Sequence, residues 1–356
     1  MARPSAPATS LDVARAAGVN QSTVSRSFTP GASVADATRE RVLAAARRLG
    51  YRPNAIARSL ITRRSRMIAM VVSYLDNQFY PRVIERMSQR LQQDGYHLLL
   101  FVSDSDRADT LLERLLQYQV DGLVLVSVRL SSALARDCAR AGIPVVLFNR
   151  VDAARSAGSV ASDNVAGGRL AARRLIDGGH RRIAFLAGLE DSSTSRDRER
   201  GFLDEMRAAA RTARAGSAAR RGRAPQPAPE FAGRAVGHFR FDGARTATLA
   251  LFADARRDRP DAVFVANDHM AIAALDTLRH EIGLRVPQDV SVIGFDDVPQ
   301  AGWPSYRLTT IEQAADPMVE ATVRMLLARI EDPSLAAQRV VVPVRLVERD
   351  TVRPRR

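Results

Sequence analysis

A stretch near the N-terminus, "QSTVSR", combines side chains that can read DNA bases. Gln21 can make two parallel hydrogen bonds to adenine, and Arg26 can do the same with guanine. The hydroxyl groups of Thr23 and Ser25 are short enough to reach phosphates and fix the register, whereas Ser22 reads either base only weakly. An ordinary solvent-exposed helix could carry the same residues. Base reading in a major groove is therefore one of two interpretations that the stretch alone leaves open.

A second set of polar residues follows short apolar runs further along the chain. Parallel strands place their carboxyl ends at one edge of a sheet, and open α/β sheets bind ligands at that edge. This pattern predicts a site for a small molecule. The polar residues at these positions are Asp76, Ser127, Asn149, Asp163, Asn267, Asp268 and Asp296.

The possible base-reading residues lie in a stretch with strong helix signals. Thr9 and Asp12 can form a capping box that starts a helix, and Gly18 stops that helix just after residue 17. Asn20 can cap a second helix that ends near Phe28. The short "GVN" link between them has helix-turn-helix spacing.

A third helix is expected over 36–49, ending at Gly50. Ser33 is a possible cap for it, because Ala35 cannot cap. Residues 9–50 are thus predicted to form an all-α head, preceded by a disordered tail over 1–8. The expected core of this head is Val13, Ala17, Val19, Val24, Val42, Leu43, Ala46 and Leu49.

From residue 67 the chain alternates between apolar runs and amphipathic helical stretches. Continuous apolar strands separated by helices indicate a buried, doubly wound parallel α/β sheet. The seven expected strands cover 67–73, 97–103, 121–127, 144–150, 182–188, 262–268 and 290–297.

Charge and composition limit which partners and which cellular compartment are expected for the protein. The chain has 356 residues and a net charge of +14; residues 1–66 carry +9 and residues 207–234 carry +6, so the remainder is close to neutral. A basic head on a neutral body suggests a polyanion as partner. No apolar run is long enough for a membrane span, no secretory signal is present, and the single Cys138 fits a reducing compartment, so we expect a cytoplasmic protein.

Several classes of activity lack their signatures. The sequence contains no glycine-rich phosphate loop, no GxSxG elbow and no metal-spaced pair of histidines. We therefore expect no enzyme activity, no metal and no cofactor. The stretch 208–234, rich in Ala, Arg, Pro and Gly, lacks apolar periodicity and is expected to be mostly a flexible surface insertion; a second DNA-contacting tract is the alternative.

In their order and spacing, several motifs resemble the lactose/galactose repressor (LacI/GalR) family of bacterial transcriptional regulators. They include "DVARAAGV", "STVSR", "YRPNAIARSL", "GHRRIAFLAG", "VFVANDHMAIAAL" and "VSVIGFDD". The resemblance implies a helix-turn-helix head, a hinge helix and a two-lobe sensor domain like a periplasmic binding protein. It also implies a homodimer on a pseudo-palindromic operator and allosteric control by a small molecule. A periplasmic sugar-binding protein would explain the body but not the head.

For the segment 51–65 the resemblance implies a hinge helix and linker. In relatives this helix packs against its twin, here through Ile56, and enters the minor groove. An apolar residue there, here Leu60, unstacks the central base step. The other residues implied on the same DNA-contacting surface are Tyr51, Asn54, Ala57 and Arg58.

For the sensor over 66–346 the resemblance implies an N-lobe of 66–164 plus 295–325, a C-lobe of 165–292 plus 328–346, and a tail over 347–356. A sugar or sugar acid is the implied ligand, and a purine or other metabolite is the alternative. Asp268 and Asp297 are expected to cap helices instead, and Phe79 could equally belong to the core. The implied effector residues are Phe79, Tyr80, Asn149, Asp163, Arg198, Phe239, Asn267 and Asp296, and Arg150 is a further candidate beside Asn149.

Overall fold

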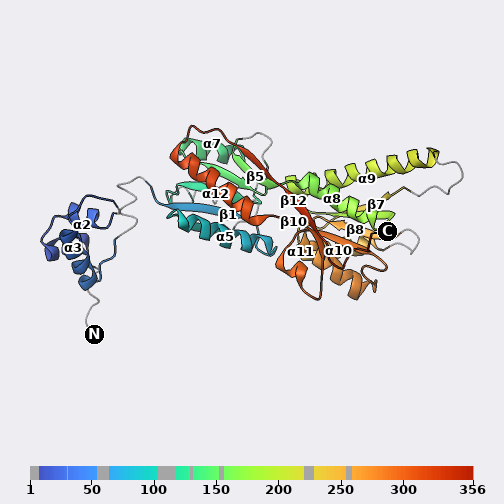
Figure 1. Ribbon diagram of the computed structural model, residues 1–356, viewed down its shortest axis with the longest axis horizontal. Helices are drawn as coiled ribbons and strands as arrows, with labels where there is room; N and C mark the ends of the chain where they lie inside the picture. The colour runs from blue at the N-terminus through green and yellow to red at the C-terminus, as the bar shows by residue number, and fades with distance from the viewer. Residues whose placement is uncertain are drawn as a thin grey trace. The chain divides into compact units, whose positions relative to one another are not determined.

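The computed structural model forms two units, residues 1–65 and 66–356, which are described separately (Figure 1). It describes residues 8–29, 31–53, 64–102, 115, 117–128, 131–151, 156–219, 228–253 and 259–355. None of the helices within these ranges is both long and apolar enough to cross a membrane.

The first unit contains the three expected helices, α1 (Ser10–Ala17), α2 (Gln21–Ser27) and α3 (Asp36–Leu49). The capping box of Thr9 is present, and Gly18 ends α1 with a left-handed φ of 63°. The Asn20 side chain caps α2 as expected. The cap expected from Ser33 is wrong, because Ala35 precedes α3 and no side chain bonds to this helix start.

A small apolar core holds the three helices together. It is built from Val13, Ala14, Val24, Val42, Ala45 and Ala46, with Ala17, Val19, Phe28 and Tyr51 packed against it. Two of the expected core residues are placed differently. Leu49 is 38% exposed, because it lies on the outer face of the last turn of α3, and Leu43 is only half-buried.

The N-lobe of the second unit is a parallel sheet in the order β11-β5-β4-β3-β1-β2. Alternate residues of β1 face α5 and α12 on one side and α7 on the other, which explains its unbroken apolar sequence. The strands are β1 (Met67–Val72), β2 (His97–Val102), β3 (Gly122–Val126), β4 (Val145–Phe148), β5 (Gly158–Ser162) and β11 (Arg339–Val342), and the helices are α5 (Phe79–Gln93), α7 (Ser132–Arg140) and α12 (Ala315–Glu331).

The C-lobe repeats this architecture in the order β12-β10-β9-β8-β6-β7, with β12 antiparallel to β10 and the rest parallel. Its strands are β6 (Arg182–Ala187), β7 (Glu230–Val236), β8 (Ala262–Val265), β9 (Ser291–Asp296), β10 (Thr309–Gln313) and β12 (Val344–Val347). Its helices are α8 (Asn164–Asp177), α9 (Ser193–Ala219), α10 (Phe241–Leu251) and α11 (Asp268–Asp276), with a short π-helix η2 (Thr277–Glu281) and a short 3-10 helix η3 (Pro299–Gly302).

All seven expected strands are present, but the expected lobe boundaries are wrong. Strand β10 pairs with β9, so residues up to 313 stay in the C-lobe. The chain crosses between lobes at Asp163, at Ala314 and at Pro343, because α12 and β11 belong to the N-lobe and β12 to the C-lobe. The apolar pattern identifies strands but does not say which sheet a late strand joins.

The described parts of two expected irregular segments are regular. In the insertion expected over 208–234, α9 continues to Ala219 and β7 begins at Glu230, while residues 220–227 lie outside the described residues. Alanine and arginine are strong helix formers, so α9 continues without an apolar stripe. The tail expected over 347–356 is also wrong, since the Thr351 hydroxyl is buried and donates 2.7 Å to the carbonyl of Val292.

Candidate DNA-reading helix and effector site

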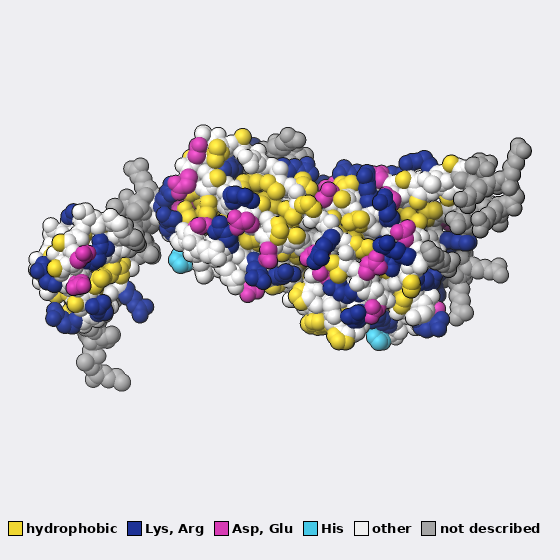
Figure 2. Space-filling view, in the orientation of Figure 1, with side chains coloured by type: hydrophobic (Ala, Val, Ile, Leu, Met, Phe, Trp, Pro, Cys, Tyr) yellow, Lys and Arg dark blue, Asp and Glu magenta, His cyan; other side chains and the backbone are white. Residues whose placement is uncertain are grey.

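The exposed face of α2 carries the predicted base-reading residues. Val24 and Ser27 are buried, and Gln21, Ser22, Ser25 and Arg26 are consequently exposed on the opposite side. Figure 2 shows basic side chains gathered on the visible face of the head, with few acidic ones. A basic, exposed helix is suited to lie against phosphates and base edges.

Hydrogen bonds within the head fix several of these side chains. Asn20 Oδ1 accepts from the Thr23 amide (2.8 Å), the Thr23 hydroxyl (2.6 Å) and the Ser22 hydroxyl (2.8 Å). Gln21 Nε2 donates to Ser10 Oγ at 2.8 Å. Arg26 makes only long contacts of 3.4 Å to Ser22, so its guanidinium is the group most available to a base.

Of the predicted hinge residues, only Tyr51 lies within the part of the chain that the structure describes. Asn54, Ala57, Arg58 and Leu60, like Ile56, lie outside the described residues. Tyr51 is described, and its ring packs edge-to-face on Phe28 with centroids 5.9 Å apart. Contact of Tyr51 with DNA stays a prediction.

The centre of the second unit is a buried ion pair between Arg198 on α9 and Asp296 at the end of β9. Their side chains are 2% exposed, and Arg198 Nη1 lies 3.5 Å from Asp296 Oδ1. Two glycines let α8 approach α9 closely enough to position Arg198. A Cβ at Gly168 would lie 2.1 Å from the Arg198 carbonyl oxygen, and one at Gly201 would lie 2.0 Å from the Val165 carbonyl oxygen.

The Arg198 guanidinium is bonded and stacked on several sides. Its Nε donates to Asn164 Oδ1 at 2.8 Å, and Nη1 also donates to the carbonyl of Ala266. The guanidinium carbon lies 3.6 Å from the centroid of the Phe295 ring, a cation–π contact. Burial lowers the pKa of Arg198, and the Asp296 charge opposes that effect.

Asp296 accepts hydrogen bonds from both lobes. Gln313 Nε2 donates to Oδ1 at 2.6 Å, and Asn77 Nδ2, from the N-lobe, donates to Oδ2 at 3.0 Å. Burial raises the pKa of Asp296, although Arg198 and the two amides counteract this. The backbone φ of Asp296 is 131°, in the range that favours glycine, so the side chain is held in place at some conformational cost.

The N-lobe contributes a second group of polar side chains. The Tyr80 hydroxyl bonds Ser127 Oγ and accepts from Asn149 Nδ2 at 3.3 Å. Asn149 Oδ1 is buried without a hydrogen-bond partner among the described residues. Arg150 Nη1 donates to Thr194 Oγ1 of the C-lobe at 2.8 Å, a second polar bridge between the lobes. The lobes therefore meet through donors and acceptors that a polar ligand could use.

Four of the predicted effector residues make other contacts. The Asp163 side chain caps α8, and the Asn267 side chain caps α11. The Phe79 ring stacks on Phe148 at 6.4 Å, and the Phe239 ring fills the space above Gly188. Whether any of these residues also touches a ligand stays a prediction.

The capping roles expected for two other aspartates are wrong. Asp268 accepts from the Val298 amide at 3.0 Å and from the Thr310 hydroxyl at 2.6 Å, while its neighbour Asn267 caps α11. Asp297 accepts from Arg349 Nη2 at 2.7 Å. Both carboxylates hold loops and strands of the C-lobe together.

Sequence reasoning missed four polar residues of this cluster, namely Asn77, Asn164, Thr194 and Gln313. Asn77 precedes Phe79 in "NQFY", Thr194 lies in "STSRDR", and Gln313 ends β10. Asn77 lies five positions beyond the end of β1, and β10 was not among the expected strands, so a search next to the expected strand ends would not have found Asn77 or Gln313. Thr194 has no such signal either, because it lies in the first turn of α9.

The buried Asp268 predicts a pH dependence of stability. Burial, and secondarily the charge of Asp296, raises the pKa of Asp268 from 3.8 to about 7. Between these pH values the folded protein binds more protons than the unfolded chain, so the free energy of unfolding falls as pH rises. We expect urea unfolding to show a larger loss between pH 5 and pH 7.5 in the wild type than in Asp268→Asn. Equal losses in both proteins would contradict this assignment.

Matches to family models cover the head and both lobes. Residues 9–54 match the model of bacterial regulatory proteins, lacI family. Residues 65–217 match periplasmic binding proteins and the sugar binding domain of the LacI family, and residues 172–352 match the periplasmic binding protein-like domain.

Relatives and solved structures are similar over nearly the whole chain. The ribose operon repressor of Escherichia coli strain K12 is 34% identical over 345 residues, which is 96% of this chain and 99% of the repressor. A lac repressor dimer bound to operator and the anti-inducer ONPF has a TM-score of 0.82 at 27% identity, covering 98% of this chain and 100% of that chain. A complex of the transcriptional regulator CelR with cellobiose has a TM-score of 0.69 at 31% identity, covering 97% and 99%.

Proposed function

The chain belongs to the LacI family of bacterial regulatory proteins, and from this membership we propose that it is a transcriptional repressor controlled by a small polyhydroxylated ligand. Its curated relatives include repressors, and we infer a regulatory rather than a catalytic role for it. A protein that acts on chromosomal DNA in a bacterium works in the cytoplasm.

In this proposal two heads read the two half-sites of a pseudo-palindromic operator. The exposed face of α2 supplies Gln21, Ser22 and Arg26 to base edges, and Ser25 to a phosphate. The Thr23 hydroxyl already donates to Asn20, so its proposed role is to hold the start of the helix and to reach phosphate only by rotating. A homodimer on operator is supported by the similarity to the lac repressor dimer.

The hinge follows the head in the same proposal. Leu60 is inserted between base steps of the minor groove, and Asn54, Ala57 and Arg58 lie along the same contact surface. An isolated helix this short is marginal in water, so it forms only with DNA and its twin. A change in the distance between the two sensor domains of the dimer would then control whether the hinge helix forms.

We infer the chemical class of the ligand from the buried Arg198–Asp296 pair and the amides and hydroxyls that surround it. Sugar hydroxyls both donate and accept, so they can bond the carboxylate, the guanidinium and the unpaired Asn149 Oδ1 together. An apolar ligand that displaced the bonds of Asn77 to Asp296 and of Arg150 to Thr194 would leave these buried groups unpaired, at a cost of about 1–3 kcal/mol each. We therefore infer a sugar or a sugar acid.

The same groups link the ligand to DNA binding. Asn77 of the N-lobe bonds Asp296 of the C-lobe, and Arg150 bonds Thr194 across the same boundary. A ligand that replaces these bonds by its own changes the angle between the lobes. In a dimer this changes the spacing of the two hinge segments and so the affinity for operator.

A thermal-shift screen of the full chain tests the ligand class. Pentoses, hexoses, their acids and nucleobases are each added to the wild type and to Asp296→Asn. At a concentration of 100 Kd a specific ligand adds about 2.7 kcal/mol to the stability, which shifts Tm by several degrees. We expect a sugar or sugar acid to shift the wild type but not the variant. A shift only by nucleobases, or equal sugar shifts in both proteins, would contradict the proposal.

A further inference from the structure

The second half of α9 carries a row of arginines that the regulatory site does not use. Arg207, Arg211 and Arg214 are all exposed, and they are spaced four and three residues apart on one helix. With a rise of about 1.5 Å per residue, the backbone positions of these arginines lie about 6 and 4.5 Å apart along the helix axis. No aspartate or glutamate occurs from residue 206 to residue 229, so the local charge is strongly positive.

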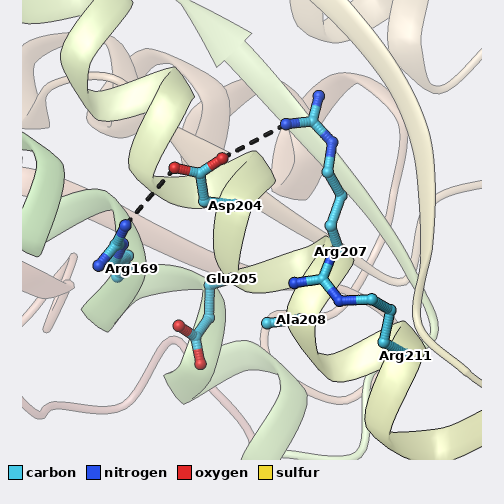
Figure 3. A pocket seen from close by; sticks show the side chains of 6 residues that line it. All are labelled: Arg169, Asp204, Glu205, Arg207, Ala208 and Arg211. Atoms are coloured by element: carbon cyan, nitrogen blue, oxygen red, sulfur yellow. Dashed lines mark hydrogen bonds and ion pairs between the residues drawn. The ribbon is translucent and has the colours of Figure 1, made fainter.

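Within the described ranges, acidic side chains lie close only to the N-terminal end of this row of arginines. A shallow hollow of about 330 Å³ lies there between α8 and α9, lined by Arg169, Asp204, Glu205, Arg207, Ala208 and Arg211 (Figure 3). Asp204 pairs with Arg169 at 3.5 Å and with Arg207 at 3.4 Å. Glu205 pairs with Arg173 at 2.7 Å. In the part of the chain that the structure describes, Arg211 and Arg214 have no ion-pair or hydrogen-bond partner.

The shape of this surface suits a linear polyanion better than a small anion. Arg169 and Arg207 are 52% and 64% exposed, so the hollow does not enclose a ligand. The arginines extend in a line along a helix that projects beyond the C-lobe sheet (Figure 1). A DNA strand carries a phosphate about every 3.4 Å of helix axis, so its phosphates are dense enough for each arginine of a row spaced at about 6 and 4.5 Å to reach one.

We propose that the arginine row Arg207, Arg211 and Arg214 is a second, sequence-independent contact with duplex DNA. The proposal rests on operator binding by the head, which holds the chain on DNA and so raises the concentration of further duplex around α9. Arginine contacts to phosphates need no base sequence and add affinity through release of counterions. The row would then let an operator-bound protein hold a second DNA segment.

A bridging assay on the full chain tests this. Operator DNA is fixed on beads and loaded with protein, and the capture of a labelled duplex without operator is measured against salt. The test variant is Arg207→Gln/Arg211→Gln/Arg214→Gln, in which glutamine removes charge but keeps helix propensity. The control is Arg136→Gln/Arg140→Gln/Arg324→Gln, which removes the same charge from exposed positions on α7 and α12.

We expect the wild type and the control to capture the second duplex and the test variant to lose at least about tenfold of that capture. Log affinity falls with log salt concentration, and each lost phosphate contact reduces the steepness of this fall by about 0.9. Three lost contacts therefore reduce it by about 2.7 per protomer. Equal capture by test variant and control would overturn the proposal, as would binding of the row to an acidic polypeptide but not to DNA. Failure to retain protein on the operator beads would instead contradict the head's role.

Discussion

Replacing Arg198 with leucine is expected to lower the free energy of unfolding by about 3–5 kcal/mol and to abolish effector binding. The change leaves the Asp296 carboxylate buried without its cationic partner. It also removes the donor to Asn164 Oδ1 and to the Ala266 carbonyl. The loss of unfolding free energy should be larger at higher pH. Burial already raises the pKa of Asp296, and without Arg198 the buried carboxyl group is less destabilising when it is protonated.

Asp296→Asn provides the matched control for this prediction. Asparagine keeps the shape of the side chain and removes the charge, so the double variant should be more stable than Arg198→Leu alone. Urea unfolding of the wild type, both single variants and the double variant gives the coupling energy of the pair. Additive losses would show that the two residues stabilise the fold independently, which would contradict the buried pair as the centre of the site.

Arg26→Ala is expected to weaken binding to the operator by about 1–3 kcal/mol, or roughly 5- to 150-fold, with a much smaller effect on unrelated duplex. Arg26 is exposed and makes only 3.4 Å contacts within its own helix, so its removal should leave the head folded. Base reading, rather than general charge, then accounts for the loss.

Arg15→Ala is the control for Arg26→Ala, since Arg15 is also exposed and lies near the end of α1. Both proteins lose one positive charge from the head. Competition assays with operator and with scrambled duplex at fixed salt separate specific from non-specific binding. If Arg15→Ala weakens operator binding as much as Arg26→Ala does, the specific role of Arg26 is wrong.

The head could be predicted almost completely because its signals are local. Thr9, Asp12 and Gly18 each act within one helical turn, and the structure places all three as their types suggest. Seven apolar strands were equally readable, because a strand buried on both faces needs an unbroken apolar sequence. The strands β5, β7, β10, β11 and β12 were not expected. Leu49 was misplaced because burial depends on where α3 contacts α1 and α2, which sequence spacing does not give.

The site was only partly predictable because its contacts join distant residues. Arg198 and Asp296 lie 98 positions apart and Asn77 and Asp296 lie 219 apart, so only a family motif could associate the first pair. The lobe boundaries failed for the same reason, since pairing of β10 with β9 is a property of the sheet. The helix over 208–219 was missed because its Ala and Arg residues lack an apolar stripe, although α9 is already anchored by its packed first half.

The central claim is that a ligand bound at Arg198 and Asp296 changes the affinity of the head for operator. Operator titrations of the wild type and Asp296→Asn, each with and without the sugar or sugar acid found by thermal shift, test it most directly. We predict that the ligand changes the operator Kd of the wild type by at least tenfold and leaves that of Asp296→Asn unchanged. The same change in both proteins, or none in the wild type despite saturating ligand, would contradict the account.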